Sequence, residues 1–128
     1  MVVQPVMQAV DRVQAGHSVV ATPKFAFANI AAGTTDGAIV AAVTGKRILV
    51  LLFRVMAGGT ATTFTFTTKP GGAGSAISET YPCGINGGQA GSYSPVGHFR
   101  TDTGEGLSGT TGAGATVAVG VVYVEVDP

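Results

Sequence analysis

Charged residues are scarce in this sequence. Asp, Glu, Lys and Arg make up 11% of its 128 residues, and seven basic residues balance seven acidic ones. An ordinary soluble domain carries about 25% charged residues. Binding to nucleic-acid phosphates requires a clustered excess of Lys and Arg, whereas only Lys46 and Arg47 are adjacent here. The composition therefore argues against nucleic acid as a partner.

Cysteine is nearly absent, and so are long apolar runs. The single cysteine, Cys83, has no partner for a disulfide within the chain, so stability must come from packing and we expect a reducing compartment. The longest apolar run, Ile48–Phe53, has six residues, whereas a membrane helix needs about 20. The N-terminus also lacks the basic stretch and apolar core of a signal peptide. We therefore expect no membrane partner and a soluble chain that is intracellular when it is made.

Residues that could build a catalytic or metal site are few and poorly placed. The stretch Tyr93–Leu107 carries His98 and Asp102, but on one strand these side chains would stand about 13 Å apart and would not touch. Cys83 lies in a Pro/Gly-rich turn rather than at a helix N-terminus, where a thiolate would be favoured. With His17 and His98 as the only histidines and no second cysteine, a zinc site is not expected. The glycine-rich loops lack the Gly-Lys-Ser/Thr ending of a phosphate-binding loop. We predict no catalytic residue, no metal and no cofactor, and therefore no enzyme.

The first sixteen residues differ from the rest of the chain. Their apolar side chains recur at helical spacing, at Val3, Val6, Met7, Val10 and Val13. Pro5 suits a first helical turn and Gly16 suits a C-terminal cap. A helix of about eleven residues is marginal alone in water, so it needs a surface to lie on. The pattern predicts that residues 1–16 form an N-terminal arm that becomes ordered against a neighbour; a frayed terminus is the alternative.

The remainder of the chain, residues 17–128, has the composition of a β-protein. Twenty glycines accompany abundant Thr and Val, and tryptophan is absent. Strand-like runs alternate with glycine-rich turns, at residues 17–22, 25–30, 38–43, 47–56, 60–68, 75–81, 97–102 and 115–126. Short strands separated by such turns are typical of an antiparallel β-sandwich or jelly roll. We predict an all-β fold with one sandwich domain.

Two of these runs indicate which faces are covered. In the run 60–68, Phe64 and Phe66 alternate with threonines, which predicts a sheet with one dry side and one wet side. The run 47–56 is apolar on both sides, with one set of alternate residues at Leu49, Leu51, Phe53 and Val55 and the other at Ile48, Val50, Leu52 and Met56. A sandwich covers only one face of each sheet, so the second face needs the arm, a loop or another subunit. We therefore predict a homo-oligomer, dimer or trimer, with contacts through Leu52, Arg54 and Met56. Arg54 would need a carboxylate or carbonyl partner there.

Three segments carry a resemblance to a known family. They are VAAVTGKRILVLLFRVMAGGTATTFTF, YSPVGHFRTDTGEGL and VAVGVVYVEV, which together span Val40 to Val126. This pattern resembles small β-sandwich structural proteins of tailed bacteriophages, encoded near the capsid genes. His98 stands where the family usually has a Trp, and GEGL stands where it has GEAL.

The resemblance implies a virion protein similar to capsid decoration, or cement, proteins. Such a protein would bind the major capsid protein and stabilise the shell after assembly in the host cytoplasm. The arm residues expected to contact the capsid are Val3, Val6, Met7 and Val10. Two alternatives remain. One is a tail or fibre component that recognises a host-surface glycan, with Tyr81 and Tyr93 as its loop aromatics, and the other is a small enzyme that uses Cys83 or His98.

Overall fold

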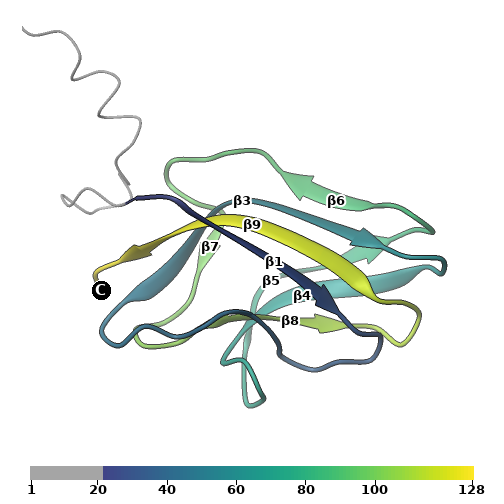
Figure 1. The fold of residues 1–128 in the computed structure, drawn as a ribbon, viewed down its shortest axis with the longest axis horizontal. Coiled ribbons are helices and arrows are strands. Elements are labelled where there is room, and N and C mark those ends of the chain that lie inside the picture. The colour runs from purple at the N-terminus through teal and green to yellow at the C-terminus, as the bar shows by residue number, and fades with distance from the viewer. Residues whose placement is uncertain (1–21) are drawn as a thin grey trace, which may run out of the picture.

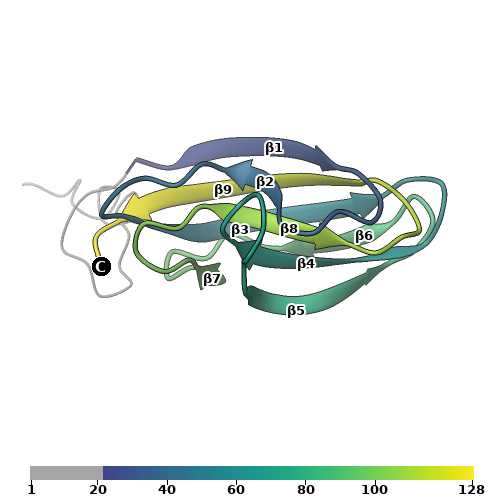
Figure 2. The same cartoon turned by 90° about the horizontal axis from the view of Figure 1, so that it is seen from below.

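The protein is a two-layer sandwich of β-strands. Residues 22–128 are described by the computed structural model, and they form nine strands and no α-helix. Sheet A has the order β1 (Lys24–Ile30), β9 (Val117–Val126), β3 (Arg47–Ala57) and β6 (Gly88–Gly91), with β7 (Phe99–Arg100) also paired to β3 (Figure 1). Sheet B has the order β2 (Gly37–Val40), β8 (Leu107–Thr111), β4 (Thr62–Thr68) and β5 (Ala76–Cys83). In Figure 2, β1 of sheet A lies at the top and β5 of sheet B at the bottom. The predicted antiparallel β-sandwich is confirmed.

Three of the predicted segments either lie outside the described residues or form less strand than predicted. The arm predicted for residues 1–16 lies outside the described residues, as does nearly all of the run 17–22. The run 97–102 contributes only the two-residue strand β7, because the chain turns at Gly97 on one side and at Gly104 on the other, both at positive φ.

Aromatic side chains join the two sheets. Phe64 and Phe66 point inward from β4 and are fully buried, and the Phe66 ring meets the Phe53 ring of β3 edge to face, with 5.3 Å between centroids. On the opposite side of β4, the Thr65 hydroxyl lies 2.8 Å from the Thr80 hydroxyl of β5. The predicted dry and wet sides are seen at Phe64, Thr65 and Phe66, whereas Thr67 is buried, with its hydroxyl 2.8 Å from the Ser108 hydroxyl of β8.

A β-bulge changes the alternation in β3. Val50 pairs with Tyr123, but Leu52 pairs with the adjacent Val122, so Leu51 is an extra residue. The core side chains of β3 are therefore Ile48 and Val50 before the bulge and Phe53, Val55 and Ala57 after it. The division predicted for the run 47–56 was wrong, because it assumed unbroken alternation.

The bulge places a second buried cluster on the outward side of sheet A. It contains Leu49, Leu51, Val124 and Val126. The loop between β6 and β7 crosses this part of β3, with Ser94 donating a hydrogen bond to the Leu51 carbonyl over 2.8 Å. Gly97 approaches so closely that a Cβ there would lie 2.3 Å from Leu49 Cδ1. One end of the outward side is thus covered by the chain itself.

Candidate binding surface

The polar residues of the stretch Tyr93–Leu107 do not assemble into one site. His98 places Nε2 2.6 Å from the Ser92 carbonyl oxygen. Asp102 pairs with Arg47 over 3.2 Å, and Glu105 pairs with Lys69 over 3.5 Å. Within the described part of the chain, no side-chain hydrogen bond or ion pair joins His98, Arg100, Asp102 and Glu105 to one another; Asp102 and Glu105 meet only through the backbone, where the Glu105 N–H donates to the Asp102 carbonyl over 3.0 Å. The side chains of His98, Asp102 and Glu105 hold neighbouring segments in place.

Thr101 is the central residue of this stretch, although sequence reasoning did not single it out. Its side chain is fully buried. The hydroxyl accepts a hydrogen bond from the Ile48 N–H over 2.9 Å and donates one to the Glu105 carbonyl over 2.9 Å. Thr101 therefore ties the turn before β8 to the start of β3.

Cys83 is poorly suited to act as a nucleophile. It is buried at the end of β5, and its nearest hydrogen-bond acceptor is the Tyr81 carbonyl, 3.8 Å from Sγ. Burial raises the pKa of the Cys83 thiol above its ordinary value, because a thiolate loses hydration there.

Residues 22–128 offer neither a metal-ligand cluster nor a membrane-spanning helix. That region holds no group of three or more His, Cys, Asp or Glu side chains able to bind a metal. It also contains no helix that is long and apolar enough to cross a membrane.

The outward side of sheet A, beyond the covered end, is an exposed surface that nothing in the described chain packs against. Three cross-strand rows form it: Asn29, Ala118, Met56 and Gly88; then Phe27, Gly120, Arg54 and Ala90; then Phe25, Val122 and Leu52. We call these residues the open face. Only Asn29 has a polar uncharged side chain, and only Arg54 is charged. Phe25 and Phe27 are 71% and 73% exposed, which is unusual for aromatic residues in a strand.

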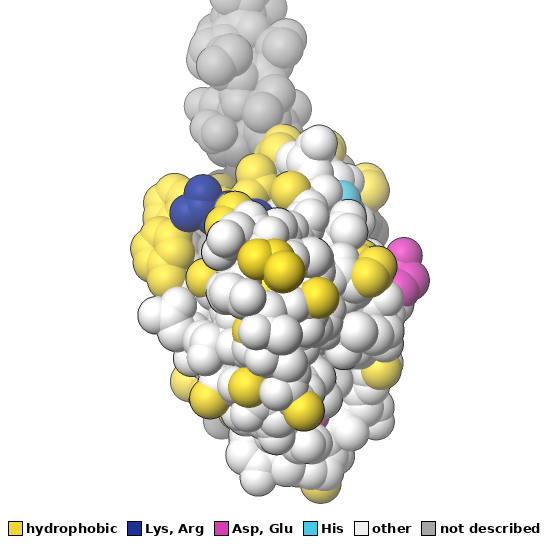
Figure 3. Space-filling view, turned by 90° about the vertical axis from the view of Figure 1, so that its right-hand side faces the viewer, with side chains coloured by type: hydrophobic (Ala, Val, Ile, Leu, Met, Phe, Trp, Pro, Cys, Tyr) yellow, Lys and Arg dark blue, Asp and Glu magenta, His cyan; other side chains and the backbone are white. Residues whose placement is uncertain are grey.

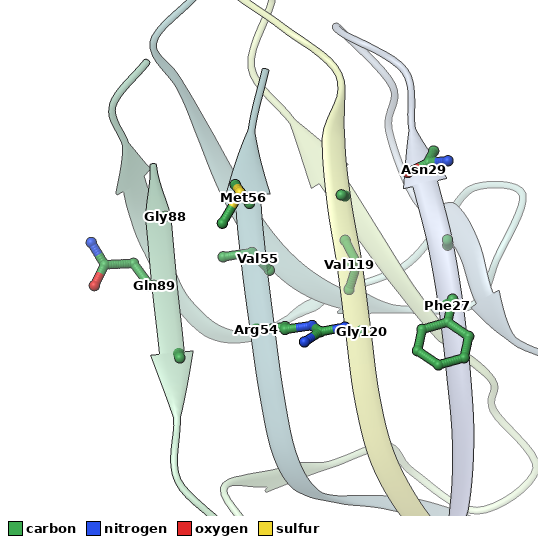
Figure 4. Close-up of a pocket in the computed structure, with 12 residues that line it drawn as sticks. Phe27, Asn29, Arg54, Val55, Met56, Gly88, Gln89, Val119 and Gly120 are labelled. Carbon is green, nitrogen blue, oxygen red and sulfur yellow. The ribbon is translucent and has the colours of Figure 1, made fainter. Parts of the chain in front are cut away.

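The open face is hollow. Ala118, Gly120 and Ala90 form a low floor, while Phe27 and Met56 rise from β1 and β3. The hollow has a volume of about 710 Å³, and an adjoining hollow of about 260 Å³ extends it toward Phe25 and Leu52. Figure 4 shows these strands side by side, with β6 on the left and β1 on the right. In Figure 3, hydrophobic side chains gather beside basic ones at the left of the view, and few charged side chains appear on this end of the molecule.

Arg54 lies across the floor of the hollow. Its side chain extends from β3 over β9 at Gly120, toward Phe27 (Figure 4). A Cβ at Gly120 would lie 3.1 Å from Arg54 Nε and 3.6 Å from Phe27 Cδ1. The missing side chain of Gly120 therefore leaves room for the guanidinium group. Among the described residues, Arg54 has no hydrogen-bond or ion-pair partner, so its five donors are available to a ligand.

Sheet B differs on its outward side. Thr63, Thr65 and Thr110 occupy outward positions of β4 and β8, and Thr80 faces outward from β5. Such hydroxyl-rich surfaces are well hydrated, whereas an apolar patch marks a contact site. The asymmetry identifies the open face, rather than the other side of the sandwich, as the candidate binding surface.

The open face includes the residues predicted for oligomer contact. Leu52, Arg54 and Met56 share it, and their contact with another copy stays a prediction. The predicted capsid-contact residues Val3, Val6, Met7 and Val10 lie outside the described residues.

Two aromatic residues of the open face were not predicted from the sequence, and one of the two predicted loop aromatics lies on a strand. Sequence reasoning missed Phe25 and Phe27, whose alternation with Ala26 and Ala28 was the available signal. Tyr81 is not a loop aromatic, because it lies on β5 and its ring packs 5.4 Å from the core residue Phe53. Tyr93 lies in the β6–β7 loop and is 45% exposed.

Comparisons with known proteins add no relative. The chain matches no family model, no curated protein and no solved structure.

Proposed function

We propose that the chain is a non-catalytic structural protein of a phage virion, a capsid decoration protein that binds the major capsid protein and stabilises the shell. The open face is the observation that carries this proposal. It presents contiguous apolar side chains around one basic group, which is the composition of a protein-contact surface. The resemblance of the sequence to phage structural proteins supplies the class of partner.

Stabilisation would come from area buried across the joints between shell subunits. Each 100 Å² of apolar contact contributes about 2.5 kcal/mol before the costs of binding. A rigid sandwich without disulfides suits this role, because the contacts made by many copies together stabilise the shell. In this proposal Val3, Val6, Met7 and Val10 contact the shell, while Leu52, Arg54 and Met56 contact a neighbouring copy in a dimer or trimer.

Arg54 sets a requirement on the partner. Burying its guanidinium group without an acidic or carbonyl partner would be costly. The surface that covers the open face must therefore bring an Asp, a Glu or a cluster of carbonyl oxygens to the middle of the hollow.

The proposal is tested by counting this chain in gradient-purified particles with quantitative mass spectrometry. A copy number comparable to that of the major capsid protein is expected for a decoration protein. A handful of copies would contradict decoration and favour the tail or fibre alternative. Absence from the particle would overturn both structural roles and return attention to Cys83 and His98.

A matched pair of variants tests the surface separately. Arg54→Glu should lower the copy number, because it reverses the only charge on the open face. Arg100→Glu changes an exposed arginine on β7 and should leave the copy number unchanged. Equal incorporation of both variants would exclude a role of the open face in incorporation, through the shell or through a neighbouring copy, even if the wild-type protein is abundant in the particle.

A further inference from the structure

We propose that two copies of this chain associate by pairing their β1 strands edge to edge, antiparallel, across a two-fold axis at Phe27. The main-chain groups along the outer side of β1 carry this contact. The inference goes beyond the proposed function, because it concerns the free protein and a contact between copies that does not involve Leu52, Arg54 or Met56.

β1 is an end strand of sheet A. It pairs with β9 over all seven of its residues, and no other described strand of sheet A lies beyond it, at the right of Figure 4. Ala26 and Ala28 face the core but are only half-buried, as expected where a sheet stops. The outer side of such a strand presents a row of N–H and C=O groups to which a further strand can bind.

The other end strands of the described sandwich carry features that oppose such pairing. β2 and β6 have four residues each and β7 has two, and the pairing of β2 with β8 shifts register. β5 has eight residues, but it includes the exposed Glu79 and Pro82, which has no N–H, and its pairing with β4 also shifts register. Short length, charge, proline and bulges are the means by which proteins block edge-to-edge association.

β1 has none of these features. It is seven residues long, contains no proline and pairs without a register shift. Its one charged residue, Lys24, stands at its first position and pairs with Glu125 of β9 over 3.0 Å. Its interior exposes Phe25 and Phe27 instead. Among the described end strands, a second β1 is therefore the one that can pair with β1 along its whole length.

The sequence of β1 also suits pairing with itself. When Phe27 lies opposite Phe27 of the second copy, all seven residues are paired and Phe25 lies opposite Asn29. The two Phe27 rings then meet on the same side of the sheet, and cross-strand aromatic pairs are favourable. Lys24 lies opposite Ile30, so the two lysines stand about 20 Å apart. No like charges oppose each other in this register.

Packing two open faces against each other is a poorer arrangement. A two-fold axis through the centre of the open face would bring two Arg54 guanidinium groups together, and the described residues of that face include no carboxylate to separate them. Edge pairing instead leaves five strand spacings, about 24 Å, between the two β3 strands. Both open faces then lie on the same side of one continuous sheet and stay available to another partner.

The size of the contact sets its strength. It joins seven residues on each side, whereas a standard interface has about 20–30. We therefore expect a dimer that dissociates in the micromolar range rather than a permanent one. Because the two-fold pairing uses the β1 edge of both copies, it closes at two.

Disulfide trapping in the free, full-length protein tests the register. Phe27→Cys is combined with Cys83→Ala, and the matched control carries Phe25→Cys in the same background; both phenylalanines are exposed to a similar extent, and circular dichroism checks the fold. Cysteines at position 27 would have Cα atoms about 4.5–5.5 Å apart, within disulfide range, whereas those at position 25 would stand about 13 Å apart. Mild oxidation should therefore link two chains at least about 10-fold faster through position 27. Equal rates, or faster linkage through position 25, would overturn the proposal.

Sedimentation velocity gives a second readout. The wild-type protein should shift from monomer to dimer between about 1 and 500 µM. Phe27→Lys places like charges opposite each other and should raise the dissociation constant of the dimer at least about 10-fold, whereas Met56→Lys, two strands from the edge, should leave it unchanged. A wild-type protein that stays monomeric would refute the proposal, and equal weakening by both variants would show face-to-face packing instead. Because no shell is present, failure here leaves the capsid proposal untouched, and failure of the copy-number test leaves this one untouched.

Discussion

The packing of Gly97 against Leu49 sets the limit of the open face, and one substitution tests it. We predict that Gly97→Ala lowers the free energy of unfolding by about 2–5 kcal/mol. Part of the loss, about 1–2 kcal/mol, comes from holding alanine at a φ of +85°. The rest, about 1–3 kcal/mol, comes from overpacking, because the new Cβ would lie 2.3 Å from Leu49 Cδ1.

Gly45→Ala is the matched control. Gly45 has a similar φ of +76°, but nothing lies within 4 Å of a Cβ built there, so only the backbone cost of about 1–2 kcal/mol is expected. Urea unfolding followed by far-UV circular dichroism measures both variants, since the chain has no tryptophan. Equal losses of stability would refute the packing of the β6–β7 loop on β3 and would extend the exposed apolar surface over Leu49.

Three further predictions follow from described contacts and from the proposals. Thr101→Val should lower the free energy of unfolding by about 1–3 kcal/mol, because it leaves a buried N–H unpaired; Thr63→Val, at an exposed site, should change it by less than about 0.5 kcal/mol, and urea unfolding compares the two. Burial raises the pKa of Cys83 and of Tyr81, so above about pH 8.5 the unfolded chain loses protons first and stability should fall with rising pH. That fall should be smaller in Cys83→Ala, and an identical slope in unfolding experiments from pH 7 to pH 10 would contradict the assignment. Deletion of residues 1–15 should leave a folded domain by circular dichroism but weaken attachment to particles, and undiminished attachment in a sedimentation assay would remove the arm from the binding mechanism.

Much of the fold could be predicted from the sequence, because most strands are rich in Val, Thr or aromatic residues. The strands that were missed, β6 and β8, both contain glycines, and the glycine-rich stretch that includes β6 was interpreted as a turn. These glycines serve close packing instead. A Cβ at Gly88 would lie 1.7 Å from the Val55 carbonyl oxygen, and one at Gly109 would lie 2.2 Å from the Phe64 ring. Glycine in a strand cannot be told from glycine in a turn until its neighbours are known.

Which side of a strand points into the core was harder to predict than where the strand lies in the sequence. In β3 both sets of alternate residues are apolar, so the pattern carried no trace of the bulge at Leu51. In β1 the larger side chains would be expected to face the core, yet Ala26 and Ala28 pack against it and Phe25 and Phe27 point outward. The register with β9, set by residues about 100 positions away in the chain, decides this. Arg54 was placed correctly on the side of β3 that faces away from the core, because it is a single charged residue that interrupts an apolar run.

The orientation of β1 is the strongest reason to regard the open face as a binding surface rather than an accident of composition. Exchanging the roles of its alternate residues would hide both aromatic rings and leave alanines outside, with a gain in buried apolar area. The chain instead keeps alanines against the core and exposes rings of more than 70% accessibility beside a floor of small residues. Gly120 matters to that floor, since a Cβ there would lie 3.1 Å from Arg54 Nε, closer than ordinary contact, while reaching Phe27 Cδ1 at a van der Waals distance of 3.6 Å. The two phenylalanine rings, the floor of small residues and the Arg54 guanidinium group thus form one surface of defined shape. A complementary segment or subunit would recognise that shape.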